Sequence, residues 1–469
     1  FELAWHLYFF TIIRIFGGGW NFKKCGKVKL MLKIRLLRYF VPCNDRKKLN
    51  QKGFALVFVI IGIVVVSLIA AAGIYIQKPQ SRKELPRIGF DNQHTTTSTM
   101  KLVAGERVDN KGCSGSGAVM FGTSPMDPKD VSVILPYGGM IEAHVTPIDH
   151  MYFSPAIFDS PRDSYEVRAM ADGLITAIGE RTQNVNDTNN GSPKLAEYQM
   201  KFWYTCDFAS YYDLITSLSP RLQAEFEKNK KSGGYAQVEI RVKEGEVVGR
   251  IGGQTLDFAV YDYTKILPGF IVPEHYLAES WKLHVVDPFQ YFKEPVRSQL
   301  LALNPRQVEP KEGKIDYDVD GKLVGTWFKE GNNGFGNTGG QNSSPWRAHL
   351  SFAYDYIDPS ALVISIGDYN GKSAQFGVIG NAPDPKTVDI KTELQKYELT
   401  FIEYLRGSDG GHWDRMSPQT DIKAHPQVNV QGVALVQMQD DRKIKFEAFP
   451  GKTAEQVNGF TNSALIYER

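Results

Sequence analysis

Three alternating aspartates in the stretch DYDVDG, residues 316–321, have the spacing of the first half of a calcium-binding loop. Such a loop offers carboxylate oxygens at alternate positions and completes the shell with a bidentate glutamate at position twelve. Position twelve is Trp327 in this chain. The surrounding residues alternate between apolar and polar, and Asp320-Gly321 is a frequent turn pair of hairpins. We therefore interpret residues 314–328 as a β-hairpin, with a calcium loop as the alternative.

Other common chemical motifs are incomplete. The stretch SGSG at 114–117 does not have the Gly-x-Ser-x-Gly pattern of a serine nucleophile, and the glycine- and asparagine-rich stretch 330–346 lacks the Gly-Lys-Ser/Thr of a phosphate-binding loop. The four cysteines have no zinc-finger spacing. If the C-terminal part of the chain lies outside the cytoplasm, Cys113 and Cys206 are candidates for a disulfide.

Four further stretches together carry a resemblance to one protein family. They are HVTPIDHMYF (144–153), ADGLITAIGE (171–180), YYDLITSLS (211–219) and VKEGEVVGRIGGQTLDFAVYD (242–262). In order and spacing they resemble the motifs of lysostaphin-type zinc peptidases, whose core is a β barrel-sandwich called the duplicated hybrid motif. The resemblance covers about a third of the chain. It implies a peptidase-like domain that acts on, or binds to, the bacterial cell wall.

The resemblance also implies a ligand set, with departures. It places metal ligands at His144, Asp149 and Asp257, although the first two are one residue further apart than in the family and the third is a histidine there. Thr255 and Asp213 stand where the family has helper histidines. In an active enzyme Asp213 would have to act as the acid–base group, for which an ordinary carboxyl pKa near 4 is poorly suited. We therefore predict a domain without catalysis or cofactor, with a zinc enzyme as the alternative.

Several aromatic residues and one histidine are candidates for ligand binding. An aromatic ring offers a flat apolar face on which a sugar can stack. Packing in the core, or an ordinary turn position for the histidine, is the alternative for each of them. The candidates are His150, Trp203, Trp346, Tyr369 and Trp413.

One apolar segment predicts a membrane anchor. Residues Gly53–Ile76 contain no charged residue, and a helix of this length crosses a bilayer. Between Asn21 and Gly53 there are eleven Lys or Arg residues and one acid, which predicts a cytoplasmic N-terminus and extracytoplasmic C-terminal domains. Met31 is a candidate start, in which case residues 1–30 would not be translated. The junction Gly53-Phe54 weakly resembles the signal of type IV pilins, but Phe58 stands where pilins have glutamate.

These elements predict a mainly β protein with five parts. Strands are expected on both sides of Asp172-Gly173 as a hairpin, with short helices at 221–231 and at Val296–Leu303. Seven further strand patterns from Lys314 onward predict a C-terminal sandwich or barrel. The predicted parts are a basic segment (1–52), a transmembrane helix (53–76), a stalk (77–129), the peptidase-like domain (130–304) and the C-terminal β domain (314–469).

The predicted function is binding or structural support in the cell envelope. The partners would be the membrane, through Gly53–Ile76, and either cell-wall glycan or peptide or another envelope protein. No folded basic domain indicates nucleic-acid binding. The alternatives are an active peptidoglycan endopeptidase, a pilin-like subunit, and a lipocalin-like binder of apolar ligands, which the Gly-x-Trp of LVGTWF (323–328) suggests.

Overall fold

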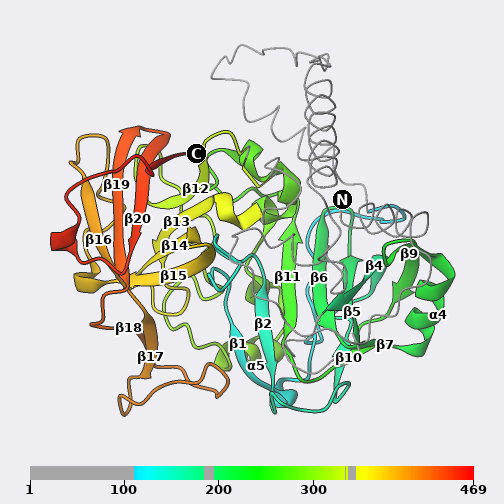
Figure 1. Ribbon diagram of the computed structural model, residues 1–469. Coiled ribbons are helices and arrows are strands. Elements are labelled where there is room, and N and C mark those ends of the chain that lie inside the picture. Colours follow the sequence, from blue (N-terminus) through cyan, green and yellow to red (C-terminus); the bar gives the residue numbers. More distant parts are fainter. Residues whose placement is uncertain (1–109, 184–194, 333, 336–344) are drawn as a thin grey trace, which may run out of the picture. The chain divides into compact units, whose positions relative to one another are not determined.

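The computed structural model describes residues 110–183, 195–332, 334–335 and 345–469. The basic segment, the membrane helix and most of the stalk that the sequence predicts lie outside the described residues, so they stay predictions. Among the described residues no helix combines the length and the apolar character needed to cross a membrane. The described chain is mainly β, as predicted, with antiparallel sheets and a closed C-terminal barrel (Figure 1).

An eight-stranded antiparallel sheet organises the first half of the described chain. In spatial order its strands are β1 (Val131–Leu135), β2 (Met151–Pro155), β11 (Leu256–Asp262), β6 (Phe208–Ile215), β5 (Leu195–Trp203), β4 (Gly173–Gln183), β9 (Tyr235–Val242) and β8 (Lys230–Lys231). The strand β11 thus lies between β2 and β6. This order brings together segments that are more than a hundred positions apart in the sequence.

The two faces of this sheet differ in polarity. Met151, Phe153 and Phe258 are fully buried on one face, within a large apolar core. Because successive side chains of a strand point to opposite sides, the residues between them point to the other face. The register pairs Asp257 with Tyr152 on β2 and with Asp213 on β6. We call this second side the polar face; it carries Tyr152, Arg181, Gln199, Tyr211, Asp213 and Asp257.

The predicted hairpin through Asp172-Gly173 is wrong. The strand before it, β3 (Tyr165–Arg168), belongs to a separate sheet with β10 (Val247–Ile251) and β7 (Ser217–Leu218), whereas β4 pairs with β5 and β9. Two backbone hydrogen bonds explain the crossing: Ala169 N–H donates to the carbonyl of Glu246, and Gly245 N–H donates to the carbonyl of Ala169. The backbone that leads into β10 therefore holds the chain just before the turn, which keeps β3 in a different sheet from β4.

A disulfide and several short helices complete this half. Cys113 and Cys206 are joined, which ties the segment before β1 to the turn between β5 and β6. The helix expected at 221–231 is α4 (Pro220–Asn229), which buries Leu222 and Phe226, and the helix expected at Val296–Leu303 is α5 (Val296–Ala302). The 3₁₀ helices here are η2 (Pro128–Asp130), η3 (Pro273–His284) and η4 (Pro288–Tyr291).

The segment 305–313, which lies between the two predicted β domains, is packed against both halves of the described chain. Arg306 is almost fully buried and donates hydrogen bonds to the carbonyls of Pro310 (2.6 Å) and Tyr356 (2.8 Å). Tyr137 N–H donates to the carbonyl of Glu312 (2.7 Å). These contacts hold the chain in place between the sheet and the barrel.

Eight strands close the C-terminal barrel in meander order. They are β12 (Gly325–Lys329), β13 (His349–Tyr354), β14 (Leu362–Tyr369), β15 (Lys372–Val378), β16 (Gln395–Thr400), β19 (Gly432–Asp440), β20 (Lys443–Pro450) and β21 (Leu465–Glu468), and β21 pairs back with β12. The helices η5 (Pro345–Ala348), η6 (Ile379–Asn381) and η7 (Ala454–Gln456) lie in its connections. Of the two C-terminal folds that the sequence predicted, the barrel is confirmed.

The predicted hairpin at 314–328 is also wrong, because only β12 forms there and Asp320-Gly321 makes a turn without a strand before it. Trp327 is completely buried in the barrel core. The guanidinium of Arg469 lies 4.0 Å from the centre of its ring. Large side chains also meet across the interior, where the ring of Phe352 lies 6.0 Å from Tyr397 and 6.2 Å from Phe446. This interior is therefore packed with side chains.

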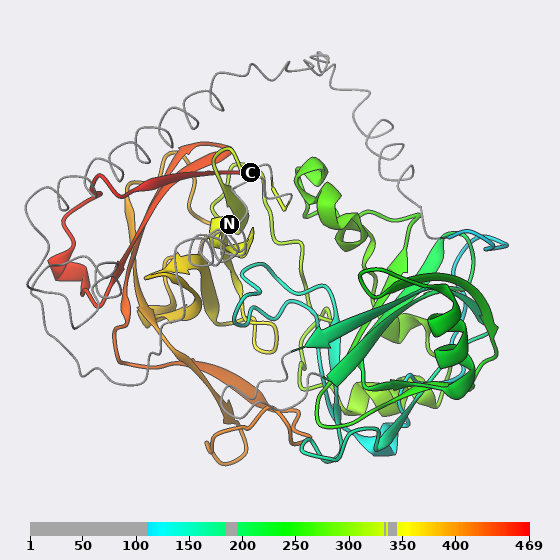
Figure 2. The ribbon, with the colours of Figure 1, turned by 45° about the vertical axis from the view of Figure 1, so that its right-hand side comes forward.

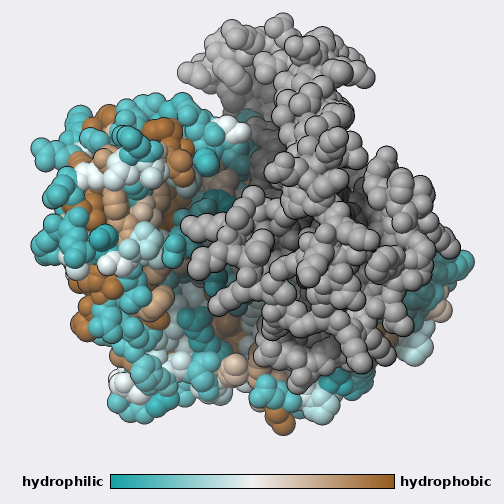
Figure 3. All heavy atoms as spheres, in the orientation of Figure 1, coloured by the Kyte–Doolittle hydropathy of each residue, from teal (hydrophilic) through white to brown (hydrophobic). Residues whose placement is uncertain are grey.

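Two strands leave the barrel as an arm. β17 (Ile402–Arg406) and β18 (Ile422–Pro426) lie between β16 and β19 in the sequence and pair with each other. Figures 1 and 2 show them projecting beyond the barrel wall. Tyr404 and Trp413 of the arm share a small core with Val133 and Leu135 of β1. Over the barrel surface in Figure 3, hydrophilic side chains are interspersed with smaller hydrophobic groups.

Candidate functional site

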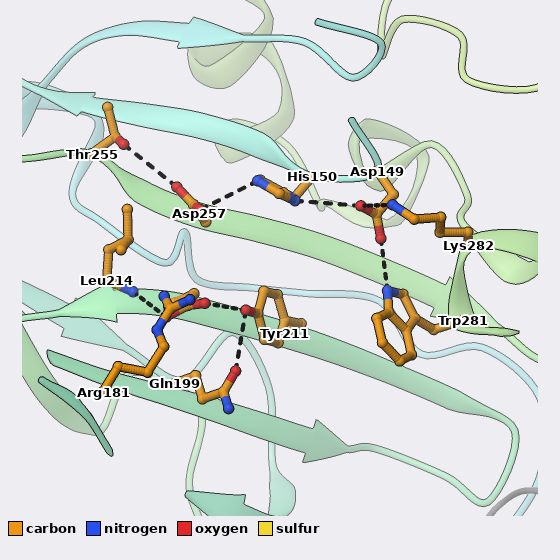
Figure 4. Close-up of polar contacts among 11 residues, drawn as sticks. Asp149, His150, Arg181, Gln199, Tyr211, Leu214, Thr255, Asp257, Trp281 and Lys282 are labelled. Atoms are coloured by element: carbon orange, nitrogen blue, oxygen red, sulfur yellow. Dashed lines mark hydrogen bonds and ion pairs between the residues drawn. The ribbon is translucent and has the colours of Figure 1, made fainter. Parts of the chain in front are cut away.

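Asp149 and Asp257 form an acidic cluster with His150 beside the polar face (Figure 4). The imidazole of His150 lies between two carboxylates: Nδ1 is 3.5 Å from Asp149 Oδ1, and Nε2 is 3.3 Å from Asp257 Oδ2. Asp257 is the second residue of β11, and His150 directly precedes β2. The pairing of these two strands therefore creates the contact. Thr255 Oγ1 lies 3.5 Å from the other oxygen of Asp257.

Asp149 is held by groups from the distant helix η3. Lys282 Nζ lies 2.7 Å from Asp149 Oδ1, and the indole N–H of Trp281 donates to Asp149 Oδ2 at 2.8 Å. The same ammonium lies 3.2 Å from Glu279 Oε2. The side chains of Lys282 and Asp149 are less than a tenth exposed. A buried ion pair of this kind must be well hydrogen-bonded to offset the cost of removing two charges from water.

The charges in this cluster stabilise one another. Burial alone would lower the pKa of His150, but Asp257 and Asp149 outweigh it and raise that pKa to about 10. Burial would raise the pKa of Asp149, but Lys282 and His150 hold it below its usual value. Burial opposes the charge of Lys282, yet Asp149 and Glu279 raise its pKa as well. At neutral pH we therefore describe His150 as an imidazolium and Asp149 as a carboxylate.

Asp213, the predicted acid–base residue, has partners of its own. The guanidinium of Arg181 pairs with its Oδ1, the hydroxyl of Tyr211 donates to its Oδ2, and Leu214 N–H donates to Oδ1 at 2.7 Å. Burial raises the pKa of Asp213, although Arg181 and Tyr211 oppose this effect. Asp213 lies opposite Asp257 in the β6–β11 register. Both of its oxygens are thus engaged by side chains of the protein.

His144, the first predicted metal ligand, faces aromatic rings. Its ring centre lies 6.1 Å from that of His150 and 6.4 Å from that of Trp346. Burial lowers the pKa of His144 to about 4, and the positive charge of His150 adds to this effect. The two neighbouring histidines therefore differ in charge at neutral pH, since His144 is neutral.

The predicted ligands do not fit a metal ion as they are arranged. Within the described residues, no group of three or more His, Cys, Asp or Glu side chains is placed to hold one. Lys282 and His150 already neutralise Asp149, and His150 also contacts Asp257. A zinc ion would have to displace these cations, because it needs the same carboxylate oxygens. We derive no chemistry through a metal here.

The aromatic candidates do not gather at one place. Trp203 is buried and stacks on Tyr263, with ring centres 5.1 Å apart. Trp413 is buried in the core of the arm and donates its indole N–H to the carbonyl of Ser417 at 2.8 Å. Tyr369 donates its hydroxyl to the carbonyl of Gln431 at 2.7 Å. Of these candidates only Trp346, beside His144, lies near the acidic cluster.

The aspartates of the stretch DYDVDG are paired with cations as well. Asp316 lies 2.5 Å from Lys314 Nζ, Asp320 lies 3.0 Å from Arg442 Nε, and Asp318 lies 3.5 Å from Arg469 Nη1. The backbone N–H of Thr326 also donates to Asp318 at 2.8 Å. The three carboxylates therefore stabilise the start of the barrel and do not form a calcium loop.

Sequence reasoning missed three residues that hold the acids: Lys282 and Arg181, which neutralise Asp149 and Asp213, and Trp281, which donates a hydrogen bond to Asp149. The sequence could have indicated Arg181, because a charged residue near the end of an alternating strand predicts which side of the strand is the polar face. Trp281 and Lys282 lie in an irregular 3₁₀ segment with no periodic pattern. No local sequence pattern predicts that they contact Asp149, which is more than 130 positions away.

Comparison with known proteins gives little information beyond this geometry. No family model and no curated protein matches the chain. Two crystal forms of Helicobacter pylori Csd3 match it distantly. The orthorhombic form has a TM-score of 0.21 and 14% identity, and the match covers 38% of this chain and 35% of Csd3. The hexagonal form has a TM-score of 0.20 and 15% identity, and the match covers 38% of this chain and 34% of Csd3. The match spans about a third of the Csd3 chain. At this TM-score the likeness carries no argument about function.

Proposed function

We propose that this chain is a non-catalytic binding protein of the bacterial cell envelope, anchored by one N-terminal helix. One observation carries the proposal: cations of the protein itself pair with the acidic residues of the polar face. Lys282 pairs with Asp149, His150 pairs with Asp257, and Arg181 pairs with Asp213. In place of a metal the site has fixed positive charges on side chains. Such charges repel a divalent cation and cannot activate a water as a metal does.

The ligand that we propose is cell-wall glycan or peptide. The support is the resemblance of residues 144–262 to lysostaphin-type peptidases, together with the chemistry of the polar face. Gln199 and Tyr211 on this face, and Trp281 of η3 beside it, are half-buried and offer amide, hydroxyl and aromatic groups. Lys201 lies 5.5 Å above the indole of Trp281. Aromatic and amide groups of this kind suit a polar ligand made of sugars and short peptides.

The proposed location follows from the sequence outside the described residues. The uncharged segment Gly53–Ile76 would cross the membrane, with the basic segment before it in the cytoplasm. The disulfide between Cys113 and Cys206 is compatible with an oxidising compartment outside. A pilin-like subunit would instead begin at Phe54, which mass spectrometry of the mature N-terminus would detect.

A pair of assays tests this proposal. The full chain, purified in mild detergent, is sedimented with isolated peptidoglycan and is also incubated with it in the presence of zinc. We expect sedimentation with the wall and no release of new amino termini. Trp281→Ala should weaken sedimentation, because it removes an aromatic group that lies beside the polar face. As a matched control, Trp413→Ala removes a buried indole in the arm and should leave the wall contact unchanged.

Two results would overturn the proposal. Release of amino termini that a chelator abolishes would show an active endopeptidase. A wild-type chain that stays in the supernatant at every wall concentration would show that the polar face does not bind the wall. In that second case the envelope partner would be another protein.

A further inference from the structure

A small cavity lies where the barrel wall, the arm and the segment after β1 meet. Its volume is about 110 Å³. Most of the lining is apolar and comes from Met140, Ile141, Val363, Phe401, Ile402 and the ring of Tyr404. Because a single water needs about 10–15 Å³ of such space, the cavity holds a group of roughly seven or more atoms.

One cation lines this cavity. The guanidinium of Arg415 lies 4.4 Å from the centre of the Tyr404 ring. Within the described residues it has no hydrogen bond or ion pair, so its N–H groups have no acceptor from the protein there. The backbone of Arg415 has a φ of +63°. Such a conformation is unfavourable for a non-glycine residue and is often found at binding sites.

An acid, Asp355, also lines the cavity, but its hydrogen bonds are made within the protein and it does not take up these donors. Asp355 is buried and accepts hydrogen bonds from the hydroxyl of Tyr404 and from the backbone N–H groups of Ile357 (2.9 Å) and Asp358 (2.8 Å). Tyr356 also lines the cavity, and its hydroxyl is buried without a hydrogen-bond partner in the described part of the chain. An unpaired buried hydroxyl is unfavourable, since it loses its hydrogen bond to water.

We propose that this cavity binds a small carboxylate with a short apolar chain. The carboxylate accepts hydrogen bonds from the guanidinium of Arg415, whose planar donors match its two oxygens. The hydroxyl of Tyr356 supplies a further donor. The apolar chain packs against Met140, Val363 and Phe401. Free short-chain acids and the C-terminal carboxylate of a peptide share this chemistry.

Calorimetry on the full chain in mild detergent tests the proposal. The probes are butyrate and its neutral isostere butyramide, followed by trialanine with a free or an amidated C-terminus. We expect saturable binding of butyrate and weaker binding of butyramide. If only trialanine with a free C-terminus binds, the ligand is the C-terminal carboxylate of a peptide. If butyrate binds equally well, the ligand is a free short-chain acid. The proposal is overturned if neither butyrate nor free trialanine binds at concentrations up to about 10 mM. A dissociation constant of that size corresponds to a binding free energy of about 3 kcal/mol in magnitude.

Three variants make the test specific. Arg415→Gln should weaken binding by about tenfold or more, because a hydrogen bond to a charged group is lost. Val363→Phe should abolish binding by filling the cavity. Arg442→Gln removes the same charge from the barrel surface, where it pairs with Asp320, and should bind like the wild type. If Arg415→Gln, with an unchanged melting temperature, binds butyrate as tightly as the wild type, the assignment is wrong.

Discussion

The ammonium of Lys282 lies 2.7 Å from the carboxylate of Asp149, and both side chains are buried. This pair joins the irregular segment η3 to the residue that the resemblance assigns as a metal ligand. Its consequence is that the charge of Asp149 is compensated within the chain.

Removing Lys282 should destabilise the protein. In Lys282→Met the buried Asp149 loses its cation, and breaking a buried pair in this way costs about 3–5 kcal/mol. Urea unfolding of the full chain, followed by circular dichroism, measures the change. The control is Lys443→Met, which breaks an exposed pair with Glu330 and should change the unfolding free energy little. Equal effects of the two variants would contradict the buried role of Lys282.

The charge of His150 predicts a pH dependence of stability. Its pKa is raised to about 10 in the folded chain, whereas an unfolded histidine titrates near 6.5. The folded state therefore binds the extra proton between these values. Its stabilising contribution is complete below about pH 6.5 and is lost as the pH rises through about 10.

Unfolding free energies measured from pH 6 to 10 should show this decline. His150→Gln should remove it, whereas His412→Gln changes a histidine that is largely exposed and should leave it in place. Carbon-13 NMR of the imidazole provides a direct measurement. A His150 ring that titrates near pH 6.5 would contradict the assignment.

Metal removal should have no effect. Because cations of the chain already pair with the carboxylates of Asp149, Asp213 and Asp257, we expect the purified protein to contain less than one zinc per chain after dialysis against zinc. A chelator should leave its melting temperature unchanged. Stoichiometric zinc that is lost on His144→Ala would contradict this prediction and favour an enzyme.

The disulfide should make a measurable contribution to stability. It links Cys113 to Cys206 across 93 positions, and a cross-link of this kind stabilises a protein by about 2–4 kcal/mol. We expect a reductant to lower the midpoint of urea unfolding by a corresponding amount. A Cys113→Ser/Cys206→Ser variant is the control, because its midpoint should be low from the start and should not respond to the reductant.

Arg469 should be essential to the barrel. It is buried between Asp318 and the ring of Trp327, and it also donates to the carbonyls of Val324 and Val319. Arg469→Met leaves Asp318 without its cation, with an expected loss of about 3–5 kcal/mol. Arg469→Met combined with Asp318→Asn should recover part of that loss. Near-ultraviolet circular dichroism of Trp327 would report whether the barrel core stays packed.

The sequence by itself determined the local properties of this chain. Alternating side chains and turn residues predicted a mainly β protein, the short helices near 221–231 and 296–303, and a C-terminal sandwich or barrel. Such features depend on neighbouring residues only, because backbone period and turn conformation are set within a few positions. His144, Asp149 and Asp257 were singled out by the resemblance to a peptidase family and not by this local reasoning.

Tertiary structure decided which of these residues meet and with what charge. The turn at Asp172-Gly173 looks like a hairpin locally, yet β3 and β4 lie in different sheets because their backbones pair with distant strands. Lys282 reaches Asp149, and His150 reaches Asp257, across more than a hundred positions. Strand order and register set these contacts, and both follow from the packing of the whole core rather than from any local pattern.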